Sequence, residues 1–260
     1  KSSGALRWRV RVSSEVLSAP AVKHDVVVVR TVDGKLQGLD VREGKRLWTH
    51  DSSVPALTLR STSAPVIVDD KVLGGFASGR LVALSISDGR VLWDTVIAEP
   101  RGRSELERLV DISSEPRVID KTVYVSSYQG RIAALDVESG RLIWARDMSS
   151  YAGLSVDDRA VYITDDKGQV FSLDRRDGRA LWKQDKLRAR AVTAPAVYND
   201  YVVVGDFEGY LHWMARDDGG FVARVRVDDS GIITPPATVA NMLYVYGKGG
   251  VLAAIKAGIR

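Results

Sequence analysis

The chain has 260 residues, of which 45% are hydrophobic and 27% are charged, and its formal net charge is +4. Its 37 Lys and Arg residues are scattered among 33 Asp and Glu residues, so the charge pattern predicts no nucleic-acid partner. The absence of cysteine excludes disulfides, thiolate metal sites and thiol nucleophiles. Apolar stretches such as Val26–Val29 have the length of a strand and predict no membrane span. No signal peptide is visible at Lys1, so we expect a chain that is cytosolic, processed or truncated.

Four predicted elements recur in the same order along the chain. The first is a strand marked by proline, at Ser18–Val22, Ser63–Ile67, Ser114–Val118, Thr193–Val197 and Thr234–Thr238, with a proline-free copy near Ala152–Val156. The second is a β-branched run, at Val26–Arg30, Val72–Phe76, Val123–Ser127, Val161–Thr164, Val202–Gly205 and Leu243–Tyr246. The third is a glycine turn leading into another strand, as at Gly34–Asp40, Gly79–Ser85 and Gly130–Asp136. The fourth is a second glycine turn that closes on tryptophan, at Glu43–Trp48, Asp88–Trp93, Ser139–Trp144 and Asp177–Trp182.

The closing tryptophans set the period of this repeat. Counted from Trp8, the equivalent positions are Trp48, Trp93, Trp144, Trp182 and Ala223, with spacings of 40, 45, 51, 38 and 41 residues. Self-similarity of this size indicates stacked supersecondary units. Four short strands per unit are typical of a propeller blade. We therefore predict an all-β fold in which residues 1–260 form a single β-propeller domain of six blades, with the tryptophans as structural anchors between blades.

The two ends of the repeat raise the question of ring closure. Strand counting predicts five full blades and three strands in the last, Pro235–Lys256, with a spare strand at Trp8–Val12. That spare strand could complete the last blade and close a six-bladed ring. Alternatively, it is the tail of a preceding blade, in which case the chain is an arc of a larger propeller.

Two consecutive repeats carry long insertions, and these point to a binding surface. The 45- and 51-residue spacings lengthen the links Asp51–Thr62 and Ala98–Ser113, which emerge on the same face of a propeller. The first link offers Leu57 and Leu59 beside Arg60. The second link offers charged residues of both signs, namely Arg101, Arg103, Glu105, Glu107, Arg108 and Asp111. Apolar residues rimmed by charge are typical of protein-binding sites, although leucines tucked under a solvated loop would give the same pattern.

The sequence predicts no catalytic residues, no metal site and no cofactor. His24, His50 and His212 share no ligand spacing. The acidic residues lie mostly in turns, as at Asp88-Gly89, and no phosphate loop or nucleophile elbow is present. Trp213 stands where other copies have a small residue, which favours filling between blades over binding.

The Gly-Lys/Arg-x-Leu-Trp closure resembles the repeat of pyrroloquinoline-quinone (PQQ)-type propellers. Four further stretches are informative, namely Ala56–Arg60, Glu105–Asp111, Val203–Trp213 and Asp228–Gly231, and they include the non-repeat insertions. They resemble the BamB family, the lipoprotein subunit of the bacterial outer-membrane β-barrel assembly machinery. The resemblance runs from Leu6 to the C-terminus. It implies an eight-bladed propeller on the periplasmic face of the outer membrane, of which this chain lacks the lipid-bearing N-terminal Cys and about two blades.

The same resemblance implies a function and a partner. Family members act as non-catalytic scaffolds that dock on the periplasmic (POTRA) domains of the central barrel subunit, BamA, with unfolded outer-membrane precursors as a further partner. The residues matching the family contacts are Leu57, Leu59, Arg60 and Asp111, and Arg108 lies beside them; a second family acid is Ser113 here. Two alternatives remain open from the sequence: a quinone- and calcium-dependent dehydrogenase propeller, and a sensor domain from a larger receptor.

Overall fold

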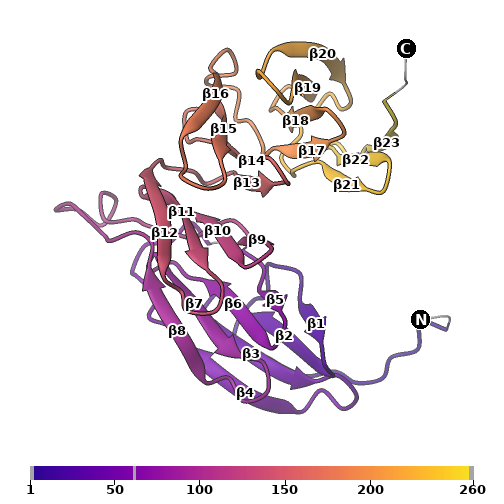
Figure 1. The fold of residues 1–260 in the computed structure, drawn as a ribbon. Coiled ribbons are helices and arrows are strands. Elements are labelled where there is room, and N and C mark those ends of the chain that lie inside the picture. The colour runs from indigo at the N-terminus through magenta and orange to yellow at the C-terminus, as the bar shows by residue number, and fades with distance from the viewer. Residues whose placement is uncertain (1–2, 61–62, 258–260) are drawn as a thin grey trace. The chain divides into compact units, whose positions relative to one another are not determined.

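A computed structural model describes residues 3–60 and 63–257, and every regular element in these ranges is a β-strand (Figure 1). The 23 strands form six antiparallel sheets, five with four strands and one with three. No segment of the described ranges is a helix long and apolar enough to cross a membrane. The chain divides into two compact units, Lys1–Leu142 and Ile143–Arg260.

The first unit contains two complete sheets and the first three strands of a third, and sequential strands are neighbours within each sheet. The first sheet comprises β1 (Ala21–Lys23), β2 (Val26–Arg30), β3 (Lys35–Asp40) and β4 (Arg46–Asp51). The second comprises β5 (Val66–Val68), β6 (Lys71–Gly75), β7 (Arg80–Ser85) and β8 (Val91–Val96). The third comprises β9 (Arg117–Ile119), β10 (Thr122–Ser126), β11 (Arg131–Asp136) and β12 (Leu142–Asp147), which starts at the boundary between the units.

The second unit continues the same pattern. Its first sheet comprises β13 (Gly153–Val156), β14 (Ala160–Thr164), β15 (Val170–Asp174) and β16 (Ala180–Gln184). The next comprises β17 (Ala196–Tyr198), β18 (Tyr201–Gly205), β19 (Tyr210–Ala215) and β20 (Phe221–Arg226). The last comprises β21 (Ala237–Val239), β22 (Met242–Tyr246) and β23 (Leu252–Ile255). The predicted all-β fold and the three-stranded last blade are thus confirmed for the described residues.

The first strands of five sheets begin three residues later than the sequence predicted, after the proline instead of before it. β1, β5, β9, β17 and β21 start directly after Pro20, Pro65, Pro116, Pro195 and Pro236. Proline has no backbone N–H to give to a sheet ladder, so it precedes the paired residues instead of joining them. The β-branched runs, by contrast, match the second strands to within one residue.

The turn between the third and fourth strands is built by an aspartate and a glycine. In the first sheet, the Asp40 carboxylate accepts hydrogen bonds from the backbone N–H groups of Arg42 (2.8 Å) and Glu43 (2.9 Å). These bonds lower the pKa of Asp40. Gly44 follows with a φ of 70°, which favours glycine. The fourth strand then skips one residue in a β-bulge opposite Gly38 and Leu39.

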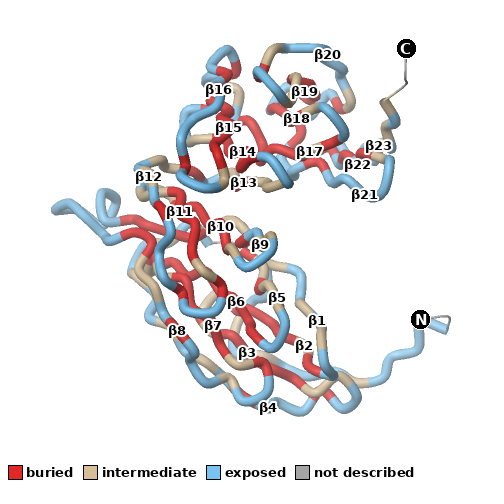
Figure 2. The backbone as a smooth tube through the Cα atoms, viewed as in Figure 1, coloured by how far each residue is buried: buried red, intermediate tan, exposed pale blue. Residues whose placement is uncertain are grey.

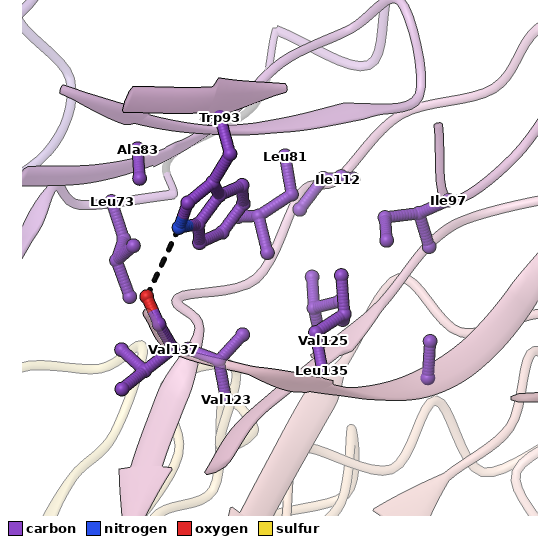
Figure 3. Packing of buried hydrophobic residues seen from close by; sticks show 11 residues of the cluster. Leu73, Leu81, Ala83, Trp93, Ile97, Ile112, Val123, Val125, Leu135 and Val137 are labelled. Atoms are coloured by element: carbon purple, nitrogen blue, oxygen red, sulfur yellow. Dashed lines mark hydrogen bonds between the residues drawn. The ribbon is translucent and has the colours of Figure 1, made fainter. Parts of the chain in front are cut away.

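The middle strands of each sheet are the most buried, as Figure 2 shows. A cluster in the first unit shows how neighbouring sheets pack (Figure 3). It joins Leu73 and Leu81 of the second sheet to Val125 and Leu135 of the third. The opposite face of the second sheet packs on the first sheet through Val72 and Leu84, so both faces of the second sheet are covered by apolar side chains, as expected for stacked blades.

Every tryptophan anchor docks on the next repeat in the same way. Trp93 Nε1 donates a 3.0 Å hydrogen bond to the Val137 carbonyl, and its ring lies over Gly140, where an added Cβ would come within 2.5 Å of it. The other four donate to the carbonyl three residues before the equivalent glycine: Trp8 to Val41, Trp48 to Ile86, Trp144 to Arg175 and Trp182 to Arg216. The glycine thus leaves room for the ring, and the carbonyl fixes its orientation.

In the fifth sheet, the large and the small residue of one facing pair have changed strands. Gly38 faces Trp48 and Ala83 faces Trp93 across their ladders, whereas Trp213 of β19 faces Ala223 of β20. Trp213 is buried and packs edge-on against Tyr198 and Tyr201. The packing role expected for Trp213 is what the structure shows. Ala223 stands at the position of the closing tryptophan, and the large side chain is instead supplied by Trp213 on the facing strand.

Trp8–Val12 is not a strand, contrary to the sequence prediction. A strand needs a neighbour to complete its hydrogen bonds, and this segment is paired with none in the described part of the chain. Trp8 nevertheless docks on the first sheet through its bond to Val41 (2.9 Å). This contact is the one expected from the tail of a preceding repeat.

Candidate partner-binding surface

The two long links both belong to the first unit. The first joins β4 to β5 and starts one residue later than predicted, because Asp51 is the last residue of β4. Its predicted end, Thr62, lies outside the described residues. The second joins β8 to β9. A hydrogen bond from Ser63 Oγ to the Ser114 carbonyl (2.9 Å) connects the residues that follow the two links.

The first link presents apolar side chains to solvent. Leu57 is 41% exposed and Leu59 is 39% exposed, and Val54 beside them is also exposed. The link is held at its base by the hydrogen bond from Ser52 N to the Gly34 carbonyl (3.0 Å). Leu57 and Leu59 are therefore not tucked beneath the loop, and their exposure fits an apolar ridge.

Arg60 pairs with an acid that the sequence did not single out. Its guanidinium forms an ion pair with Glu15, and both side chains are largely exposed. From the sequence we expect Arg60 and Asp111 to lie within ion-pair reach either of each other or of the binding partner. An exposed pair of this kind contributes little to stability, about 0–1 kcal/mol. Arg60 can therefore exchange Glu15 for an acid on another protein at small cost.

Asp111 is fully buried, so it is not the surface acid that the sequence suggested. Its backbone forms a bridge with Tyr128, whose N–H donates to the Asp111 carbonyl (2.8 Å). Its charge acts on Arg30, which is also buried. Burial lowers the pKa of Arg30 and the charge of Asp111 opposes that effect. Asp111 therefore lies in the buried base of the second link, where the positive charge of Arg30 compensates its negative charge.

The outer part of the second link is a short capped turn. The Glu107 carboxylate accepts bonds from the N–H groups of Arg103 (2.7 Å) and Ser104 (3.1 Å), and Ser104 Oγ accepts one from Glu107 N (3.2 Å). This reciprocal pattern is a capping box, and its bonds lower the pKa of Glu107. Arg108 is exposed and its N–H donates to the Ser104 carbonyl (3.0 Å).

Leu106 is the residue of this surface that sequence reasoning missed. It lies within the capped turn and is 64% exposed, whereas Leu109, Val110 and Ile112 of the same link are buried. The capping box Ser104-x-x-Glu107 was the available signal, because it predicts a local turn that contains Leu106. The candidate surface therefore comprises Leu57, Leu59, Arg60, Leu106 and Arg108, and we call it the link surface.

The hollow that the described residues form under the link surface is too small to enclose a small-molecule ligand. The hollow beneath the first link, lined by Arg30, Thr58, Arg60 and Phe76 among others, measures about 20 Å³. That volume has room for about one water molecule. Within residues 3–60 and 63–257, no three His, Asp or Glu side chains lie close enough to hold a metal ion. The arrangement is suited to contact with another protein surface.

Sheets of this topology, linked by tryptophans that dock on successive turns, define a β-propeller of the PQQ-type repeat. A family model described as "Outer membrane protein assembly factor BamB" matches residues 1–184 and 173–259. The chain belongs to this family. The assembly factor BamB of Shewanella oneidensis is 37% identical over 252 residues, which cover 97% of this chain and 64% of that protein.

Solved structures agree with this assignment. The crystal structure of BamB from Moraxella catarrhalis superposes with a TM-score of 0.92 at 30% identity, over 98% of this chain and 76% of that one. A europium-containing methanol dehydrogenase shares only the fold, with a TM-score of 0.65 at 12% identity, over 88% of this chain and 60% of that one. The chain spans just under two thirds of the length of the curated relatives it matches.

Proposed function

We propose that this chain is part of a non-catalytic scaffold that serves the assembly and insertion of outer-membrane β-barrel proteins. Family membership supports this role, because the relatives are named as outer membrane protein assembly factors. The protein would act at the periplasmic face of the outer membrane, anchored by lipid in its longer form. Unfolded barrel precursors would be a further partner.

The link surface would dock on the periplasmic POTRA domains of the central barrel subunit, BamA. The observation that carries this proposal is the exposure of Leu57, Leu59 and Leu106 on two consecutive links. Solvent-exposed leucines beside arginines fit the apolar-plus-arginine anchors found at many interfaces. Asp111 would contribute indirectly, by holding the base of the second link in place.

A double variant tests this docking. Leu57→Ala with Arg60→Ala should weaken binding to the purified periplasmic domains by about 2 kcal/mol or more, roughly thirtyfold. Leu47→Ala with Arg42→Ala is the matched control, because Leu47 is 47% exposed and Arg42 forms a comparable exposed ion pair with Asp25. If the Leu57/Arg60 variant still co-purifies with the periplasmic domains, or if the Leu47/Arg42 control loses co-purification to the same extent, the docking site lies elsewhere.

A direct assay distinguishes the scaffold from the alternative function, that of a quinone-dependent enzyme. A scaffold should show no change in absorbance and no dye-linked alcohol oxidation after addition of pyrroloquinoline quinone and calcium. Turnover above that of a heat-denatured sample would support the enzyme instead.

A further inference from the structure

A pocket in the second unit lies between the outer strand of the fifth sheet and the segment that precedes this sheet. Its volume is about 350 Å³, at the lower end of the range of ligand pockets. It is lined by Lys186, Leu187, Arg190, His212, Phe221, Val222, Ala223 and Arg224. The link surface lies in the first unit, so the pocket is a separate site and its argument does not rest on the proposed docking.

The wall of the pocket is a network of buried polar groups. Asp206 is fully buried and accepts from Arg190 Nε (2.6 Å) and from the backbone N–H groups of Glu208 and Tyr210 (3.0 Å each). Its Oδ2 lies 2.7 Å from His212 Nε2. Burial raises the pKa of Asp206, but these hydrogen bonds outweigh burial and hold it below its usual value. Asp206 thus remains charged and fixes both Arg190 and His212.

The ring of His212 lies at the base of the pocket, held by Asp206. Burial lowers the pKa of His212, against the opposing effect of Asp206. The ring contacts Phe221, with 6.0 Å between the centroids. The pocket is therefore lined by this imidazole together with the apolar side chains of Leu187, Phe221 and Val222.

The rim of the pocket carries positive charge that the described part of the chain does not neutralise. Arg190 is compensated by Asp206 and Glu208. Lys186 and Arg224 are exposed, and neither has an ion pair within the described ranges; Arg224 lies over the Tyr210 ring at 4.4 Å. The lining contains no carboxylate. A ligand with an apolar group and a nearby negative charge would satisfy both the floor and the rim.

The neighbouring strand favours an extended peptide as that ligand. β20 is an edge strand of its sheet, and all six of its residues are exposed. An edge strand can hydrogen-bond an extended chain laid beside it. We propose that this pocket binds an acidic peptide segment, with one apolar side chain between Leu187 and Phe221 and a flanking carboxylate on Lys186 and Arg224.

The test follows the chain by ¹H–¹⁵N NMR during titration with the capped peptide Gly-Asp-Phe-Asp-Gly. Saturable shifts should concentrate at the residues that line the pocket. Affinity should fall about tenfold for Lys186→Glu with Arg224→Glu, because two attractions become repulsions. It should also fall for the peptides in which Asn replaces both Asp residues or Ala replaces Phe. Lys248→Glu with Lys256→Glu changes the net charge equally at exposed sites of the last sheet and should leave affinity within twofold.

Three results would overturn the proposal. The first is the absence of saturable shifts at the pocket, and the second is equal affinity of the Lys186/Arg224 variant. The third is displacement of the peptide by phenylpropionate or by a short oligothymidylate at concentrations similar to that of the peptide itself. That result would make the site a small-molecule pocket or an unspecific patch for anions.

Discussion

Trp93 illustrates how much of the stability depends on single residues. It is 8% exposed and gives its indole hydrogen bond to the next sheet. Trp93→Ala should lower the free energy of unfolding by about 3–5 kcal/mol, because it leaves a cavity and an unpaired carbonyl. Trp8→Ala should cost clearly less, because Trp8 is only partly buried. Urea unfolding of both variants checks the order, and equal losses would contradict it.

Gly140 is the second half of the same contact. Its φ is 67° and an added Cβ would lie 2.5 Å from the Trp93 ring. Gly140→Ala should therefore destabilise the chain by about 1 kcal/mol or more, from backbone strain together with displacement of the ring. The fluorescence of Trp93 should change in the folded state as well. An alanine that is tolerated without either effect would show that the turn can shift.

Tyr162 gives the stability a predictable dependence on alkaline pH. Burial raises its pKa to about 12, and its hydroxyl accepts a hydrogen bond from Arg216 Nε (3.2 Å). In the unfolded chain tyrosine ionises near pH 10. Its contribution is thus complete below pH 10 and is lost as the pH rises from 10 to 12. Tyr162→Phe should unfold with a shallower decline of stability over pH 10–12, and parallel declines in both proteins would argue against this role.

The second link contains one leucine that we expect to bind a partner and one that we expect to stabilise the fold. Leu106 is 64% exposed, whereas Leu109, three residues later, is 6% exposed. Leu106→Ala should leave the melting temperature unchanged and weaken binding to the periplasmic domains. Leu109→Ala should lower stability by about 2–5 kcal/mol. Thermal melts and binding assays on the two variants distinguish these outcomes, and a destabilised Leu106 variant would remove it from the link surface.

The sequence predicted the elements of this fold well, because its repeat signals are local. Glycine turns and β-branched runs are read from a few neighbouring residues, so the second strands agree to within one residue. The burial of Asp111 was not predictable, because it depends on Arg30, which is 81 residues away along the chain. Nor was the choice of Glu15 by Arg60, since many acids are available to a surface arginine. The pocket beside His212 was missed because its lining comes from three separate segments, residues 186–190, 212 and 221–224.

At the scale of the whole molecule, the blade number remains a prediction. The family resemblance predicts eight blades in the longer protein, and the described residues supply six sheets. In stacked repeats, each additional neighbour adds interface stability. A longer form with all eight should therefore melt in calorimetry at a higher temperature than the 260-residue chain. Identical transitions would mean that the added residues do not stack on these sheets.

The direction of the tryptophan contacts has a consequence for the order of events during synthesis. Each of the five anchor indoles finds its carbonyl partner 31 to 44 residues later in the chain, never earlier. While the polypeptide emerges from a ribosome or a translocation pore, each newly made sheet that ends in an anchor tryptophan therefore has an uncovered aromatic ring. That ring stays exposed to water until roughly one further repeat has been synthesised. A pause in elongation would prolong the exposure of one such ring, and a chaperone that recognises aromatic side chains would meet this protein one blade at a time.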